Sequence, residues 1–284
     1  MTELTLIAGF LAAALRIATP LLFAATGELV AERAGVLNLG IEGAMLAGAL
    51  AAALAGTTYG PAVGLVAAVL AGTLAGLVVA VVAVRARADQ VITGTAVTLG
   101  AVGLTGAIYR ATLGSGGSQQ ALKTLEAPWI LSVLALLAVP TVWWLLYRTR
   151  WGLQLRAAGE DRHAAAANGV AVERTQIVAL LIAGAFAGLG GATMVLAQVG
   201  SFAEKMTAGR GFVAIAIVVL GRWSPFGVLA AALLFGGLQA LQFLLQGMGL
   251  DLPYQLFLVL PYLLTLLALA GLVGRTRAPA GLGK

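Results

Sequence analysis

Eight apolar stretches, each long enough to cross a lipid bilayer, constrain the fold of this chain more than any other feature. They lie at residues 4–26, 39–56, 61–84, 91–113, 129–147, 176–199, 225–246 and 253–273. A helix needs about 20 apolar residues to span a bilayer, where its backbone polar groups must be satisfied internally. Only 10% of the 284 residues are charged and 61% are hydrophobic, so a soluble domain is excluded. We predict the all-α class: a polytopic transmembrane helical bundle of about eight or nine membrane helices, forming one domain over 1–284.

A shorter apolar run at 211–221 decides the predicted topology. If it crosses and the N-terminus is outside, the inside loops hold twelve basic residues: Arg33, Arg85, Arg87, Arg148, Arg150, Arg156, Arg162, Arg174, Arg222, Arg275, Arg277 and Lys284. The outside loops then hold four: Arg110, Lys123, Lys205 and Arg210. Because basic residues favour the cytoplasmic side, we predict a multi-pass membrane protein with its N-terminus outside and its C-terminus inside.

Residues 27–48 place charged groups between two long apolar runs. This stretch, GELVAERAGVLNLGIEGAMLAG, carries three carboxylates, one arginine and one asparagine: Glu28, Glu32, Glu42, Arg33 and Asn38. A charged side chain within a membrane costs about 2.5–3.5 kcal/mol even on an insertion scale, unless it is paired or hydrated. We therefore expect these groups to have partners inside the bundle, or a role in transport.

Arg16 lies in the middle of the first predicted span. It requires a carboxylate or carbonyl partner, and Glu28 and Glu42 are the expected ones. The pair would either lock the first helix to the second or contact a substrate. Asn38 and Glu42 are four residues apart, so they share one face if the second helix starts early.

Several glutamines lie within predicted spans. Gln239, Gln242 and Gln246 have i, i+3, i+7 spacing and share one helical face. That face either lines a hydrated pathway or forms interhelical hydrogen bonds. The candidates for a pathway or substrate-facing role are Arg16, Asn38, Glu42, Gln198, Gln239 and Gln242.

The longest polar connection, at about 148–175, is predicted to be cytoplasmic. Within it, GEDRHAAAANG reads as a short helix, with Gly159 as its expected N-cap and Asn168-Gly169 as its end. This helix has almost no apolar face to bury in its own domain. A second protein is therefore expected to cover its alanines, although a solvated connection is the alternative.

Enzymatic and metal chemistry find little support in the sequence. The chain has one histidine and no cysteine, too few for a zinc site. It contains no G-x-x-x-x-G-K-[ST] motif to cradle ATP. We therefore predict no catalytic residue, no metal ligand and no cofactor bound by this chain.

Three segments resemble one family, the permease subunits of bacterial ABC importers for nucleosides and simple sugars. The family motif E-R-x-G-V-x-N-[LI]-G-x-E-G is matched by residues 32–43. Its L-R-A-x-G segment, with the alanines and glycine that follow, is matched by Arg156, Ala157, Gly159, Ala164, Ala165 and Gly169. A third segment, residues 211–236, resembles the family's block G-F-x-A-I-A-V-x-x-L-G-x-x-x-P-x-G.

The resemblance implies an ABC permease fold, a location in the bacterial cytoplasmic (inner) membrane, and a transporter subunit that is not an enzyme. It implies alternating access driven by separate ATPase subunits that use ATP, with an extracytoplasmic substrate-binding protein and a second, related permease as partners. The loop at 148–175 would be the coupling loop, with Arg156, Ala157, Gly159, Glu160, Ala164, Ala165 and Gly169 as its ATPase-coupling residues.

Nucleosides are the expected cargo, and simple sugars the next. Two alternatives remain open: an ABC permease for branched-chain amino acids, and a secondary transporter driven by an ion gradient. The second alternative would use Arg16, Glu28, Glu42 and Asp251 as its intramembrane ion site.

Overall fold

The computed structural model describes residues 3–112, 124–247, 259 and 278–283, and within these ranges it contains helices and no strand. The elements are α1 (Glu3–Arg33), α2 (Ile41–Tyr59), α3 (Pro61–Val79), η1 (Ala80–Arg85), α4 (Gln90–Thr112), α5 (Trp129–Arg148), α6 (Arg150–Glu160), α7 (Arg162–Ala167), α8 (Val172–Thr193), η2 (Met194–Val199), α9 (Arg210–Leu220) and α10 (Pro225–Gly247). η1 and η2 are π-helical ends of α3 and α8. The predicted all-α class is confirmed.

Seven helices in the described part of the chain are long and apolar enough to cross a membrane: Ile7–Arg33, Ile41–Tyr59, Pro61–Arg85, Gln90–Thr112, Trp129–Arg148, Val172–Val199 and Pro225–Gly247. They match seven of the eight predicted spans to within a few residues, except that the first extends further. The eighth, at 253–273, lies outside the described residues. The chain is a multi-pass membrane protein.

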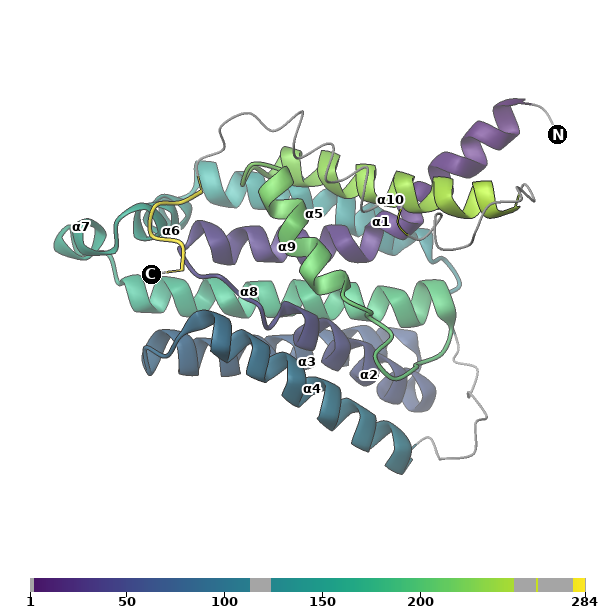
Figure 1. Ribbon diagram of the computed structural model, residues 1–284, viewed down its shortest axis with the longest axis horizontal. Coiled ribbons are helices and arrows are strands. Elements are labelled where there is room, and N and C mark those ends of the chain that lie inside the picture. The colour runs from purple at the N-terminus through teal and green to yellow at the C-terminus, as the bar shows by residue number, and fades with distance from the viewer. Residues whose placement is uncertain (1–2, 113–123, 248–258, 260–277, 284) are drawn as a thin grey trace.

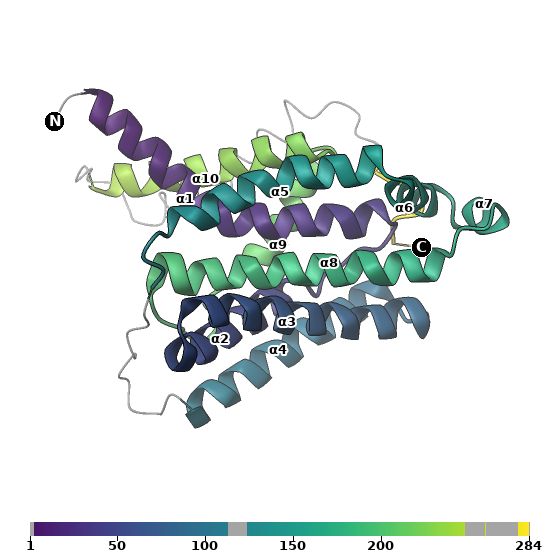
Figure 2. The same ribbon diagram turned by 180° about the vertical axis from the view of Figure 1, so that it is seen from behind.

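The helices form a bundle around a central pair, α1 and α8 (Figures 1 and 2). α2, α3 and α4 cover one side of this pair, and α5 and α10 cover the other. α6, α7 and residues 278–283 lie together at one end, and the N-terminus lies at the opposite end (Figure 1). The short helices α6 and α7 and residues 278–283 therefore share one end of the bundle.

Small residues in small-xxx-small spacing, Gly72–Gly76 on α3 and Gly184–Gly188 on α8, bring these two helices into backbone contact. A Cβ atom on Gly72 would lie 2.2 Å from the carbonyl oxygen of Gly184, and one on Gly188 would lie 2.1 Å from that of Ala68. A Cβ on Gly76 would lie 2.5 Å from the carbonyl oxygen of Leu180. These glycines therefore serve tight helix packing.

The first helix is longer than its apolar run, because α1 continues through Glu28 and Glu32 to Arg33. Residues 34–40 then form a non-helical link, with Gly35 at φ +83°, and α2 starts only at Ile41. The prediction that Asn38 and Glu42 share one helical face is wrong, since Asn38 lies in this link.

The short apolar run forms α9, which has 11 residues. At about 1.5 Å per residue, it covers roughly half of a bilayer's hydrocarbon thickness. In Figure 1, α9 runs across the bundle from the start of α2 toward the α6 end. Residues 200–209, which precede it, contain no regular helix. This segment crosses the bundle as a half-helix plus a loop.

We predict that Gly72→Ala destabilises the bundle by about 1–3 kcal/mol, the usual cost of overpacking, because its Cβ atom would clash with the Gly184 backbone. Gly103→Ala is the matched control, since nothing lies within 4 Å of a Cβ there. Thermal unfolding in mild detergent should show a lower midpoint for Gly72→Ala alone. Equal midpoints for the two variants would contradict the packing role.

Candidate functional site

The link of residues 34–40 is non-helical backbone packed inside a helical bundle, so its polar groups need partners from side chains. Leu37 donates its N–H to Gln90 Oε1 at 2.7 Å. Asn38 donates its N–H to Glu28 Oε1 at 3.1 Å. Two polar side chains, from α4 and from α1, thereby hold the middle of the link.

Both ends of the link are also held. Thr98 on α4 donates its hydroxyl to the carbonyl of Leu39 at 3.0 Å. Gln176 on α8 donates its amide to the carbonyl of Ala34 at 3.1 Å, and both groups are buried. The link thus has hydrogen-bond partners on α1, α4 and α8, which explains several polar residues inside the apolar spans.

Glu42, in the first turn of α2, fixes the start of α9. Its Oε1 accepts hydrogen bonds from the Thr207 hydroxyl at 2.6 Å and the Gly209 N–H at 2.9 Å. Its Oε2 accepts one from the Gly211 N–H at 2.6 Å. The side chain is buried, and a carboxylate is stabilised by donors at a helix N-terminus. The N-termini of two helices therefore meet at one carboxylate.

The other end of α9 is tied to the end of α1. Trp223, in the turn after α9, donates its Nε1–H to Glu32 Oε2 at 2.5 Å. Arg33 Nε donates to the carbonyl of Trp223 at 2.7 Å. α9 is thus attached at both ends to residues of the charged 27–48 stretch, which makes α1, the link, the start of α2 and α9 one connected frame.

Two carboxylate oxygens in this frame, Glu28 Oε2 and Glu32 Oε1, are buried and without a hydrogen-bond partner among the described residues.

The expected pairing of Arg16 with Glu28 or Glu42 is wrong. Glu28 bonds the link and Glu42 bonds the start of α9, whereas Arg16 is exposed and lies about 18 Å from Glu28 along α1.

Arg16 lies beside a cavity of about 290 Å³ between α1, α5 and η2. Gln198 lines the same cavity and donates its amide to the backbone carbonyl of Arg16 at 2.6 Å. Gln239 and Gln242 lie on α10, where Gln239 is half-buried and Gln242 is buried. The six pathway candidates therefore separate into three regions: the Arg16–Gln198 cavity, the frame, and α10.

The predicted coupling loop consists of two helices, α6 and α7, and not one. Asp161 is the N-cap of α7, and its Oδ1 accepts the N–H groups of His163 and Ala164, each at 2.9 Å. The hydrogen bond from the Ala164 backbone holds the pKa of Asp161 below its ordinary value. The prediction that Gly159 is the N-cap is wrong, because Gly159 lies inside α6.

Gly159 instead brings α6 against the end of α1. A Cβ on Gly159 would lie 2.2 Å from the carbonyl oxygen of Arg33 and 3.0 Å from the N of Gly35. Arg156 on α6 donates to the carbonyl of Leu146 at 3.1 Å, and its guanidinium lies 4.8 Å from the centre of the Tyr147 ring. The loop is thus firmly seated on the membrane helices.

The surface of α7 is divided between its own chain and the exterior. Ala165 is buried in a small cluster with Ala158 and Val172. Ala164 is exposed, as is Gly169, which ends the helix with φ +82°. Ala165 is therefore not part of the exposed alanine surface of α7.

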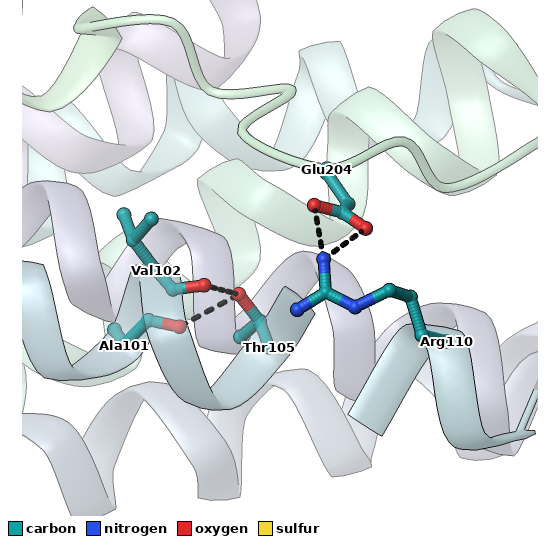
Figure 3. Close-up of polar contacts among 5 residues, drawn as sticks. All are labelled: Ala101, Val102, Thr105, Arg110 and Glu204. Carbon is teal, nitrogen blue, oxygen red and sulfur yellow. Dashed lines mark hydrogen bonds and ion pairs between the residues drawn. The ribbon is translucent and has the colours of Figure 1, made fainter. Parts of the chain in front are cut away.

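At the opposite end of the bundle, an ion pair joins α4 to the loop before α9 (Figure 3). Arg110 Nη1 contacts Glu204 Oε1 at 2.9 Å and Oε2 at 3.0 Å. Both side chains are well exposed, so the pair contributes at most about 1 kcal/mol. One turn earlier, the Thr105 hydroxyl donates to the carbonyl of Ala101 at 2.6 Å and does not face the pair.

Sequence reasoning missed four residues that hold this frame: Gln90, Gln176, Thr207 and Trp223. A polar side chain within an apolar span is the signal that could have identified Gln176. Thr207 and Trp223 lie outside predicted spans, and only the fold brings them to Glu42 and Glu32.

We predict that Trp223→Phe destabilises the protein by about 1–3 kcal/mol, because Glu32 would lose its hydrogen-bond donor while remaining buried. Trp144→Phe is the control, since Trp144 is 57% exposed. Thermal unfolding in detergent measures both. An unchanged midpoint for Trp223→Phe would show that the attachment of α9 to α1 contributes nothing.

Known proteins resemble this chain along most of its length. The family model described as "Branched-chain amino acid transport system / permease component" matches residues 10–269. "Putative glucose ABC transporter permease protein TsgC13" of Haloferax volcanii is 37% identical, covering 86% of this chain and 80% of its own.

Two proteins of Bacillus subtilis are also similar. "Guanosine ABC transporter permease protein NupQ" is 32% identical over 94% of this chain and 92% of its own. "Guanosine ABC transporter permease protein NupP" is 31% identical over 78% and 70%, respectively. No solved structure matches the chain. The chain therefore belongs to the family of ABC transporter permease components that the matching model describes.

Proposed function

We propose that this chain moves nucleosides inward as one membrane subunit of an ABC importer, by alternating access driven by separate ATPase subunits. The similarity to two guanosine permeases supports nucleosides, and the similarity to a protein named as a glucose permease keeps simple sugars as the second candidate. The observation that carries the proposal is the seating of the α6–α7 loop on the frame.

The contact between α6 and α1 provides a route for coupling. Because Gly159 leaves no space between α6 and the backbone at Arg33 and Gly35, a force on the loop acts directly on the start of the link. The link ends at α2, whose Glu42 holds α9. Movement of the loop would thereby shift two helix N-termini inside the bundle, which is where transporters open and close their pathways.

The proposed pathway residues differ in what the structure leaves available. Asn38 and Glu42 have their polar groups engaged in the frame, so we assign them to holding the helix ends and not to contact with cargo. Arg16, Gln198 and Gln239 keep exposed surface, whereas Gln242 is buried. The first three are the proposed cargo-facing residues.

The proposed assembly contains two ATPase subunits, an extracytoplasmic substrate-binding protein and a second related permease. NupP and NupQ come from one organism and both resemble this chain, which supports a pair of related permeases. The coupling loop and residues 278–283 would face the cytoplasm, with the N-terminus outside. ATP would be bound and hydrolysed by the ATPase partners.

Co-purification from the native host followed by reconstitution tests the function. We expect an ATPase and a second permease to accompany the tagged chain, and liposomes holding the complex with its binding protein to accumulate labelled guanosine only when ATP is supplied. Labelled glucose is the comparison cargo. Guanosine uptake by this chain alone, without ATP, would overturn the proposal in favour of a gradient-driven carrier.

Ala164→Trp tests the docking surface. Because Ala164 is exposed on α7, a large side chain there should block the ATPase without disturbing the bundle, so we expect recovery of the co-purified ATPase to fall at least about tenfold, the effect of a loss of 1.4 kcal/mol. Ala111→Trp, exposed at the far end of α4, is the control. Ala165→Trp cannot test docking of the ATPase, because Ala165 belongs to a buried cluster that the larger side chain would disrupt. Normal recovery with Ala164→Trp would exclude this face.

A further inference from the structure

Residues 278–283, here named the strap, lie between the coupling loop and the link. Gly281 donates its N–H to the carbonyl of Gly159 at 2.9 Å. Ala280 donates its N–H to Glu160 Oε2 at 3.3 Å. Gly283 donates its N–H toward the carbonyl of Gly35 at 3.4 Å. One short segment thus contacts both parts of the proposed coupling route.

The hydrogen bond to Gly159 satisfies a group that α6 itself leaves free. The last four carbonyls of a helix have no partner within the helix, and Gly159 is the penultimate residue of α6. The strap therefore acts as an external cap that fixes the end of α6 directly before Asp161 and α7.

Three glycines make this meeting point possible. A Cβ on Gly35 would lie 3.1 Å from the Cα of Gly159 and 3.4 Å from the carbonyl oxygen of Gly281. A Cβ on Gly281 would lie 2.8 Å from the carbonyl oxygen of Gly159. The link, α6 and the strap are therefore in backbone contact, and no side chain fits between them.

The strap is not simply embedded in the protein core, because two cavities border it. A cavity of about 690 Å³ is lined by Arg162, Gln176 and the strap residues Ala280 and Gly281. A second, of about 280 Å³, is lined by Arg162, Gln176 and Gly283. The strap thus bridges α6 and the link beside open space, and that space allows the loop to move relative to the bundle when the bridge is absent.

We propose that the strap is a positioning element for coupling: Gly281 holds the end of α6 against the link, so that displacement of α7 is passed to the link and not absorbed within the loop. This inference rests on the proposed ATPase-driven function. It assigns to residues 278–283 a role in transmission, separate from docking of the ATPase on α7.

Gly281→Val in the complete reconstituted importer tests this role. Its side chain would displace the strap from Gly159. Ala278→Val, an exposed position in the same segment, is the matched control. We expect normal ATPase co-purification and an unchanged unfolding midpoint. Labelled guanosine taken up per ATP hydrolysed should fall about three- to tenfold, in the range of known coupling changes.

A deletion of residues 278–283 should give the same low ratio of uptake to hydrolysis. A Gly281→Val ratio equal to that of Ala278→Val overturns the inference. Loss of the ATPase from a folded Gly281→Val protein also overturns it, since the strap would then belong to the docking surface, and a lowered unfolding midpoint would make it a stability element. Failure of the unmodified chain to bind an ATPase would instead reject the proposed function, and the inference with it.

Discussion

Non-helical backbone inside a membrane bundle must find its hydrogen-bond partners within the protein, and the arrangement of this molecule depends on that constraint. The link of residues 34–40 and the loop before α9 both break the helical pattern. Glu28, Gln90, Thr98 and Gln176 serve the link, and Glu42 serves the loop. Each of these five polar side chains satisfies backbone that helices leave unpaired, which offsets part of the cost of placing it in an apolar span.

The frame also explains why two kinds of residue recur along the chain. Carboxylates occur where helix ends must be held, as Glu42 holds the start of α9 and Glu32 holds the turn after it. Glycines occur where backbones meet, as between Gly72 and Gly184 or between Gly159 and Arg33. The carboxylates fix the orientation of helix ends, and the glycines fix how closely the backbones approach. Because carboxylates hold both of its ends, α9 has little freedom to move independently of α1 and α2.

Much of the fold could be predicted from the sequence, because span length and hydropathy depend on local composition. The seven described spans, the half-length of α9 and the end of α7 at Asn168-Gly169 all follow from such local signals. The partners of Glu42 could not be predicted, since Thr207 and Gly211 are more than 160 residues away. The pairing expected for Arg16 was wrong because charge complementarity indicates a possible partner but not where the carboxylate points.

A half-helix attached at both ends suits the proposed coupling, in which movement at one end of the bundle opens its centre. If Glu42 alone held α9, the end of this helix near Trp223 would be free, and α9 would tilt when the link moves. Because Trp223 is bonded to Glu32 and Arg33, both ends of α9 are tied to the same frame as the link. α9 then moves with α1 and the start of α2 as one body, and the part of the loop before Thr207, which Glu42 does not hold, is left to accommodate the difference.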